Sequence, residues 1–103
     1  MKSEYIHQLP EEWRQASAVF VALGDEQRQR ILLMFEPGEE LNISQIVAAS
    51  TLSRTAVAHH LRVLRESGVL VSRKAGKEVW FHIDPERIAT TLHSVLDYVQ
   101  SNT

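Results

Sequence analysis

The segment from residue 53 to residue 66 contains two arginines, a threonine, an alanine and a histidine at a spacing that could contact DNA. The five residues are Arg54, Thr55, Ala58, His59 and Arg62, and a helix would bring them onto a single face. In the major groove of DNA, arginine can donate two hydrogen bonds to guanine, threonine can contact a base edge or a thymine methyl, and alanine permits close approach. The other interpretation is an ordinary solvated helix face. The neighbouring elements favour the first.

Ser53 precedes this set and is expected to cap the helix. The free N–H groups of a helix start, together with Ser53 and Arg54, could bind a phosphate. Of the two histidines in this helix, His60 lies on the same side as Leu64 and is expected to pack inside, whereas His59 points outward. Adjacent residues lie on different sides of a helix, so the two histidines cannot clamp one metal ion.

A second group of cations lies in a hairpin predicted over residues 69–83. Strand-like runs flank three cations and the turn residues between them, namely Arg73, Lys74, Ala75, Gly76 and Lys77. Such a basic tip would reach phosphates or the minor groove beside the recognition helix. Lys and Arg also protect an exposed hairpin edge from aggregation, and both interpretations can hold at once.

Start and stop signals predict the helices that position these two groups. The signals are proline in a first turn, glycine or proline after a last turn, and Asp, Asn or Ser as caps. The expected boundaries are Pro10 and Gly24, Asp25 and Pro37, Asn42 and Ser50, Ser53 and Gly68, and Pro85 and Gln100. The result is a mainly α fold with a small β-hairpin, in the order α-α-α-α-β-β-α. Residues 42–66 form a helix-turn-helix and residues 69–83 a wing.

Size and charge are consistent with one binding domain over residues 1–103, since this length fits a single domain of modest core. The net charge is −2, but residues 53–78 hold six Lys or Arg against two Glu, and the rest holds five against eleven acidic residues. Phosphate attraction depends on this local charge of +4 rather than on the total. With no cysteine, no signal peptide and no membrane-length apolar run, the cytoplasm is the expected compartment.

Two stretches, LGDEQRQRILLMF and LSRTAVAHHLRVLRESGVLVSRKAGKEVWFHID, with the helix that follows, resemble the ArsR/SmtB family of bacterial winged-helix repressors over residues 15–100. The resemblance implies a homodimer that binds an imperfect palindromic operator in double-stranded DNA and represses transcription. It also implies an effector, often a metal ion, that lowers the affinity for DNA.

The usual metal ligands of that family are not matched. The segment ELNISQIV aligns with ELCVCDLA of thiolate-type sensors, which puts Asn42 and Ser44 at the cysteine positions, and neither supplies an anionic sulfur. The other common site falls on Pro85, Arg87, Tyr98 and Ser101, or, with the register shifted by one, on Asp84, Glu86, Asp97 and Gln100. The second set offers oxygen ligands that suit a hard ion. His93 with Asp97 could bind zinc only with ligands from a partner subunit.

The first and last helices, over residues 10–24 and 85–100, carry apolar stripes that are expected to form a dimer seam. Its residues are Trp13, Val19, Phe20, Leu92, Val95, Leu96 and Val99. The other possibility is that both stripes fold onto the core of their own chain. Pairing about a two-fold axis would place the recognition helices about 34 Å apart, one turn of DNA.

Among functional classes, a dimeric DNA-binding repressor without the usual metal-sensing ligands is the leading prediction. A repressor with a non-standard metal or small-ligand site, and a winged-helix module that binds protein rather than DNA, remain as alternatives. We find no nucleophile-base set, phosphate loop or catalytic metal motif, so no enzyme activity and no cofactor are expected. The effector is left open between a small organic ligand between the first and last helices, an oxygen-ligated ion, and none.

Overall fold

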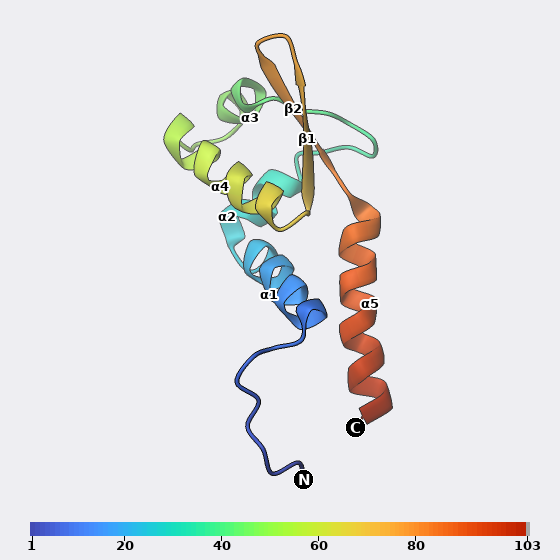
Figure 1. Cartoon of the computed structure of the whole chain (residues 1–103). Coiled ribbons are helices and arrows are strands. Elements are labelled where there is room, and N and C mark those ends of the chain that lie inside the picture. The colour runs from blue at the N-terminus through green and yellow to red at the C-terminus, as the bar shows by residue number, and fades with distance from the viewer. Residues whose placement is uncertain (103) are drawn as a thin grey trace.

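The computed structural model describes residues 1–102, which contain five helices and one β-hairpin (Figure 1). The elements in chain order are α1 (Glu11–Leu23), α2 (Glu26–Leu32), α3 (Ile43–Ala49), α4 (Arg54–Glu66), β1 (Leu70–Ala75), β2 (Glu78–Ile83) and α5 (Pro85–Asn102). The predicted fold class and element order are therefore confirmed. The hairpin and α3 lie at one end of the molecule, and both chain termini lie at the other.

Side-chain caps begin four of the helices where the sequence predicts them. The carboxylate of Asp25 accepts from the N–H of Arg28 at 3.0 Å, and Ser53 Oγ accepts from the N–H of Ala56 at 3.1 Å. Asp84 accepts in the same way at the start of α5, at 3.1 Å. At α3, Asn42 and Gln45 each accept the other's backbone N–H at 2.9 Å, which forms a capping box.

The helix α2 is shorter than the sequence indicates. It ends at Leu32, five residues before Pro37. The N–H groups of Met34 and Phe35 bond three residues back, to Ile31 and Leu32, at 3.1 and 3.2 Å. This tighter winding closes the helix before the proline is reached.

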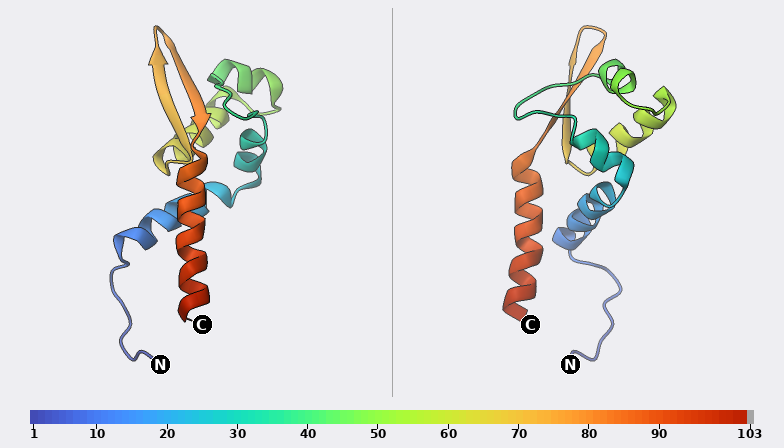
Figure 2. Two further views of the ribbon diagram at one scale, coloured as in Figure 1. Left: turned by 90° about the vertical axis from the view of Figure 1, so that its right-hand side faces the viewer. Right: turned by 180° about the vertical axis from the view of Figure 1, so that it is seen from behind.

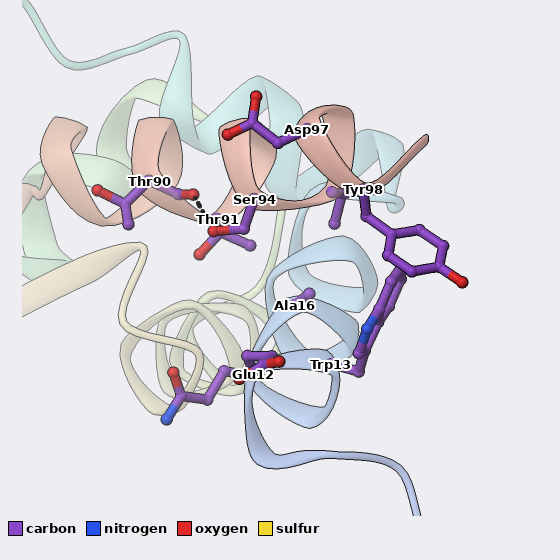
Figure 3. A pocket seen from close by; sticks show the side chains of 10 residues that line it. Glu12, Trp13, Ala16, Thr90, Thr91, Ser94, Asp97 and Tyr98 are labelled. Carbon is purple, nitrogen blue, oxygen red and sulfur yellow. Dashed lines mark hydrogen bonds between the residues drawn. The ribbon is translucent and has the colours of Figure 1, made fainter. Parts of the chain in front are cut away.

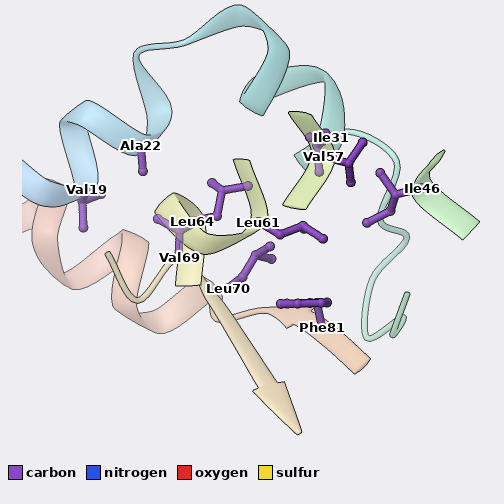
Figure 4. Close-up of a cluster of buried hydrophobic side chains, with 10 residues drawn as sticks. All are labelled: Val19, Ala22, Ile31, Ile46, Val57, Leu61, Leu64, Val69, Leu70 and Phe81. Carbon is purple, nitrogen blue, oxygen red and sulfur yellow. The ribbon is translucent and has the colours of Figure 1, made fainter. Parts of the chain in front are cut away.

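The core gathers around the inner face of α4 (Figure 4). Its buried residues come from every element except α5: Val19, Ala22, Ile31, Ile46, Val57, Leu61, Leu64, Val69, Leu70 and Phe81. Val19 was predicted for the dimer seam, and this prediction is wrong, because its side chain is fully buried. Val19 and Ala22 of α1 belong to this core, whereas the buried Ala16, three residues before Val19, lies beside α5.

The hairpin is a two-stranded antiparallel ribbon whose register pairs Leu70 with Ile83 and Ala75 with Glu78. Gly76 has a φ of +63°, which the first position of this two-residue turn requires. Only Leu70 and Phe81 of the two strands are buried. Beyond them the ribbon projects from the body of the molecule (Figures 1 and 2).

The last helix packs beside α1 but contributes no buried residue (Figure 2). The rings of Trp13 and Tyr98 meet edge to face, with centroids 5.2 Å apart, at one end of a pocket of about 390 Å³ between the two helices (Figure 3). Among residues 1–102, no helix is long and apolar enough to cross a membrane.

Four residues of the predicted dimer seam stay largely exposed in this single chain, namely Phe20, Leu92, Leu96 and Val99, at 42 to 47%. Trp13 and Val95 are half-buried and line the pocket between α1 and α5.

Candidate nucleic-acid interface

The outward face of α4 presents the predicted recognition residues together. Arg54, Thr55, Ala58, His59 and Arg62 are all exposed, and with Ile43 of α3 they line one open hollow. Ile43 was not among the predicted residues, although its place at the start of α3 puts it opposite the start of α4. The five side chains face away from the core because Val57, Leu61 and Leu64 occupy the opposite side of the helix.

Two local contacts orient the arginines of this face. Arg54 Nη1 donates to Ser44 Oγ at 3.2 Å, which ties the start of α4 to α3. Arg62 lies 3.4 Å from Nδ1 of His59, one helical turn away. Both guanidinium groups keep further N–H donors that can bond to base edges or phosphates. Ser53 uses its oxygen to cap α4, and its hydroxyl hydrogen can still be donated.

The wing differs from the prediction at Arg73. Lys74 and Lys77 are exposed near the tip, as expected, but Arg73 lies within β1 opposite Trp80. Its Nε and Nη2 donate to the two carboxylate oxygens of Glu40 at 2.6 and 2.8 Å. The side chain of Arg73 thus turns back to the loop before α3 rather than toward the tip, and whether this residue contacts DNA stays a prediction. The hydrogen bonds from Arg73 lower the pKa of Glu40, and Glu40 raises that of Arg73.

Behind the outward face of α4, His60 is half-buried against a buried arginine, so the prediction that it packs inside holds only in part. Arg28 is only 9% exposed. Its Nε donates to the carbonyl of Ala22 at 2.9 Å and its Nη2 to that of Val21 at 3.0 Å, while Nη1 lies 3.3 Å from His60 Nδ1. Burial lowers the pKa of His60, with a smaller opposing effect from Asp25. The contacts of Arg28 thus join α1, α2 and α4 on the side of α4 opposite its exposed face.

Three side chains at positions where the resemblance would place metal ligands make hydrogen bonds within the chain. Asn42 belongs to the capping box of α3, Ser44 accepts from Arg54, and Asp84 caps α5. Within the described part of the chain, no three His, Cys, Asp or Glu side chains gather closely enough to hold a metal ion.

Sequence comparison gives an independent result. Residues 25–72 match the family model "Bacterial regulatory protein, arsR family". The chain is 35% identical over 68 residues to the arsenic resistance transcriptional regulator ArsR1 of Pseudomonas putida, which covers 66% of this chain and 53% of that protein. It is 31% identical over 86 residues to ArsR2 of the same organism, which covers 82% and 74%. The chain thus spans about half of the first relative and three quarters of the second.

A solved structure shows the same arrangement of elements. An ArsR-like transcriptional regulator from Rhodococcus sp. RHA1 superposes with a TM-score of 0.77 at 27% identity, over 87% of this chain and 83% of that one. The match extends beyond residues 25–72, so α1 or α5 takes part in the likeness.

Proposed function

We propose that this chain, which belongs to the ArsR family of bacterial regulatory proteins, represses transcription as a cytoplasmic homodimer on a palindromic operator. As a member of that family it is a DNA-binding transcriptional regulator with a winged helix-turn-helix fold, and not an enzyme. The observation that carries the proposal is the exposed face of α4, where two arginines, a threonine, an alanine and a histidine line one hollow.

The contacts can be assigned by the chemistry of each side chain. Arg54 and Arg62 donate to base edges in the major groove, and Thr55 and Ala58 allow the helix to approach closely. Ser53 with the free N–H groups of the α4 start binds one phosphate. Lys74 and Lys77 of the wing contact phosphates beside it. The local charge of +4 over residues 53–78 supports attraction to DNA although the whole chain is acidic.

Dimerisation is supported by the apolar surface at the other end of the molecule. Phe20 of α1 and Leu92 and Leu96 of α5 are 42 to 47% exposed, and an exposed apolar stripe of this kind is typical of an interface. Two recognition helices placed about 34 Å apart would each read one half of a palindrome. The family's thiolate metal site does not belong to this proposal, since Asn42 and Ser44 carry no sulfur.

The test is selection of bound sequences from a random DNA pool with the full chain, followed by Kd measurements on the selected duplex. We expect Arg54→Ala and Arg62→Ala each to raise Kd by roughly tenfold or more, since a bidentate base contact accounts for about 1–3 kcal/mol. Arg14→Ala is the matched control, because Arg14 is an exposed arginine on α1, where it pairs with Glu11.

Circular dichroism verifies that each variant is folded. The wild-type Kd should also rise steeply with salt. Recovery of no enriched sequence, or unchanged Kd values for both α4 variants, would refute the proposal and favour a winged-helix module that binds protein.

A further inference from the structure

The wing is attached to the loop before α3 at two points. At the first, Leu41 and Phe81 exchange both backbone hydrogen bonds, at 2.9 and 2.8 Å. The second is the paired hydrogen bond from Arg73 to Glu40, the residue next to Leu41. In the described part of the chain, the Arg73–Glu40 pair is the only ion pair between distant segments, since the other two lie within α1 and within α2.

The position of the second attachment along the ribbon matters more than its strength. Arg73 pairs with Trp80, one step beyond the Ser72–Phe81 pair where backbone bonding to the loop ends. The outer part of the ribbon is exposed on both strands, and an isolated two-stranded hairpin is only marginally ordered in water. Glu40 therefore holds the ribbon at a point closer to its tip than the backbone hydrogen bonds between the ribbon and the loop do.

The same loop leads directly into the helix-turn-helix. Asn42, which caps α3, follows Leu41, and Ser44 of α3 holds Arg54 at the start of α4. A continuous set of contacts thus links the wing to the recognition helix, from Arg73 through Glu40 and α3 to Arg54. These contacts connect the two elements that are proposed to contact DNA.

We propose that Glu40 is a positioning residue for DNA binding, which holds the wing through Arg73 so that Lys74 and Lys77 meet the phosphates while α4 occupies the groove. The inference rests on the proposed function. It predicts an effect opposite in sign to simple electrostatics, because removal of a carboxylate near DNA should strengthen binding. If Glu40 orients the wing, its removal weakens binding instead.

The experiment compares Glu40→Gln with Glu39→Gln, a neighbouring carboxylate whose Oε1 only accepts the N–H of Glu36. Glutamine keeps the shape of each side chain, and both variants change the charge equally. We expect E40Q to raise the Kd for the selected duplex roughly fivefold, within the range for an exposed ion pair, and E39Q to leave it unchanged or lower it by up to about twofold. Equal or greater affinity for E40Q would overturn the proposal.

A mutant cycle distinguishes positioning from a general loss of structure. Lys77→Ala should weaken binding and lower the slope of log Kd against log salt by about one in the wild-type background. In the E40Q background, where the wing no longer meets its phosphate, the same change should have much less effect. Strictly additive effects would contradict positioning.

Hydrogen exchange without DNA tests the brace independently of the proposed function. The amides of residues 73–80 should exchange several-fold faster in E40Q than in E39Q, with the core amides of α4 unchanged. Identical exchange in the two variants would refute the brace even if DNA binds. A wild-type chain that fails to bind DNA would refute the proposed function, and the exchange comparison would still decide whether Glu40 orders the wing.

Discussion

Replacing Arg28 with alanine should destabilise the protein more than any substitution on its surface. Arg28 of α2 caps the C-terminal end of α1. Gly24, which follows α1, has a φ of −82° and so does not form the left-handed turn that usually satisfies the last carbonyls of a helix. The guanidinium of Arg28 takes its place by donating to the carbonyls of Val21 and Ala22. Its third contact reaches His60 on the recognition helix.

The size of the effect follows from these three contacts. A hydrogen bond from a charged donor contributes about 1.5–3 kcal/mol when its partner is left without water. The hydrogen bond to Ala22 is buried, whereas those to Val21 and His60 are part-buried. In the variant, water can therefore hydrogen-bond to the acceptors at Val21 and His60 and offset part of the loss. We therefore expect a loss of about 3 kcal/mol for Arg28→Ala, and about 2 kcal/mol for Arg28→Lys, whose single ammonium cannot span three acceptors.

Urea unfolding followed by circular dichroism measures these losses. All variants must be compared at one protein concentration, because dimerisation would add a concentration-dependent contribution. Arg14→Ala serves as the control and should change the free energy of unfolding by less than about 0.5 kcal/mol, as expected for an exposed ion pair. A loss below about 1 kcal/mol for Arg28→Ala would show that Arg28 is not needed to join α1, α2 and α4.

Two further predictions concern His60 and the dimer seam. Because burial lowers the pKa of His60, the unfolded chain binds a proton before the folded chain does, so stability should be full above the ordinary value of 6.5 and fall as the pH drops below it. His60→Asn keeps an acceptor for Arg28 and should flatten this part of the pH profile in urea titrations; an unchanged slope would contradict the assignment. Leu96→Glu should convert the proposed dimer into folded monomers in sedimentation equilibrium, since Leu96 is 47% exposed and lies in the predicted seam. Ser101→Glu, at an exposed position on the other side of α5, is the control and should leave the proposed dimer intact. A dimer unaffected by L96E would place the seam elsewhere.

Local signals in the sequence were sufficient for much of the fold. The caps at Asp25, Asn42, Ser53 and Asp84 involve residues only three positions apart, so the sequence shows both partners together. The exposed set on α4 follows equally from helical spacing, because the apolar residues of this helix lie on one side. Whether that set contacts DNA stays a prediction.

Contacts between distant residues were not predictable in this way. Arg73 and Glu40 are 33 positions apart, and Arg28 and His60 are 32 apart. A basic residue near a glycine turn has the same local pattern whether it faces DNA or a carboxylate, so Arg73 was assigned to the tip. Val19 was misassigned because the sequence of α1 does not show whether an apolar residue packs on the core of its own chain or on a partner subunit.

Because α5 has no buried side chain, the residues that fold the body of the molecule differ from those that α5 presents on its surface. The head of the molecule, from α1 to β2, has its own core, to which the terminal helix adds only the partly buried Ile88. Substitutions along the outer side of α5 therefore change which surfaces are offered to other molecules while folding of the head is retained. The outer side of such a helix can therefore change in sequence without a change in the residues of α4 and the wing that are proposed to contact DNA.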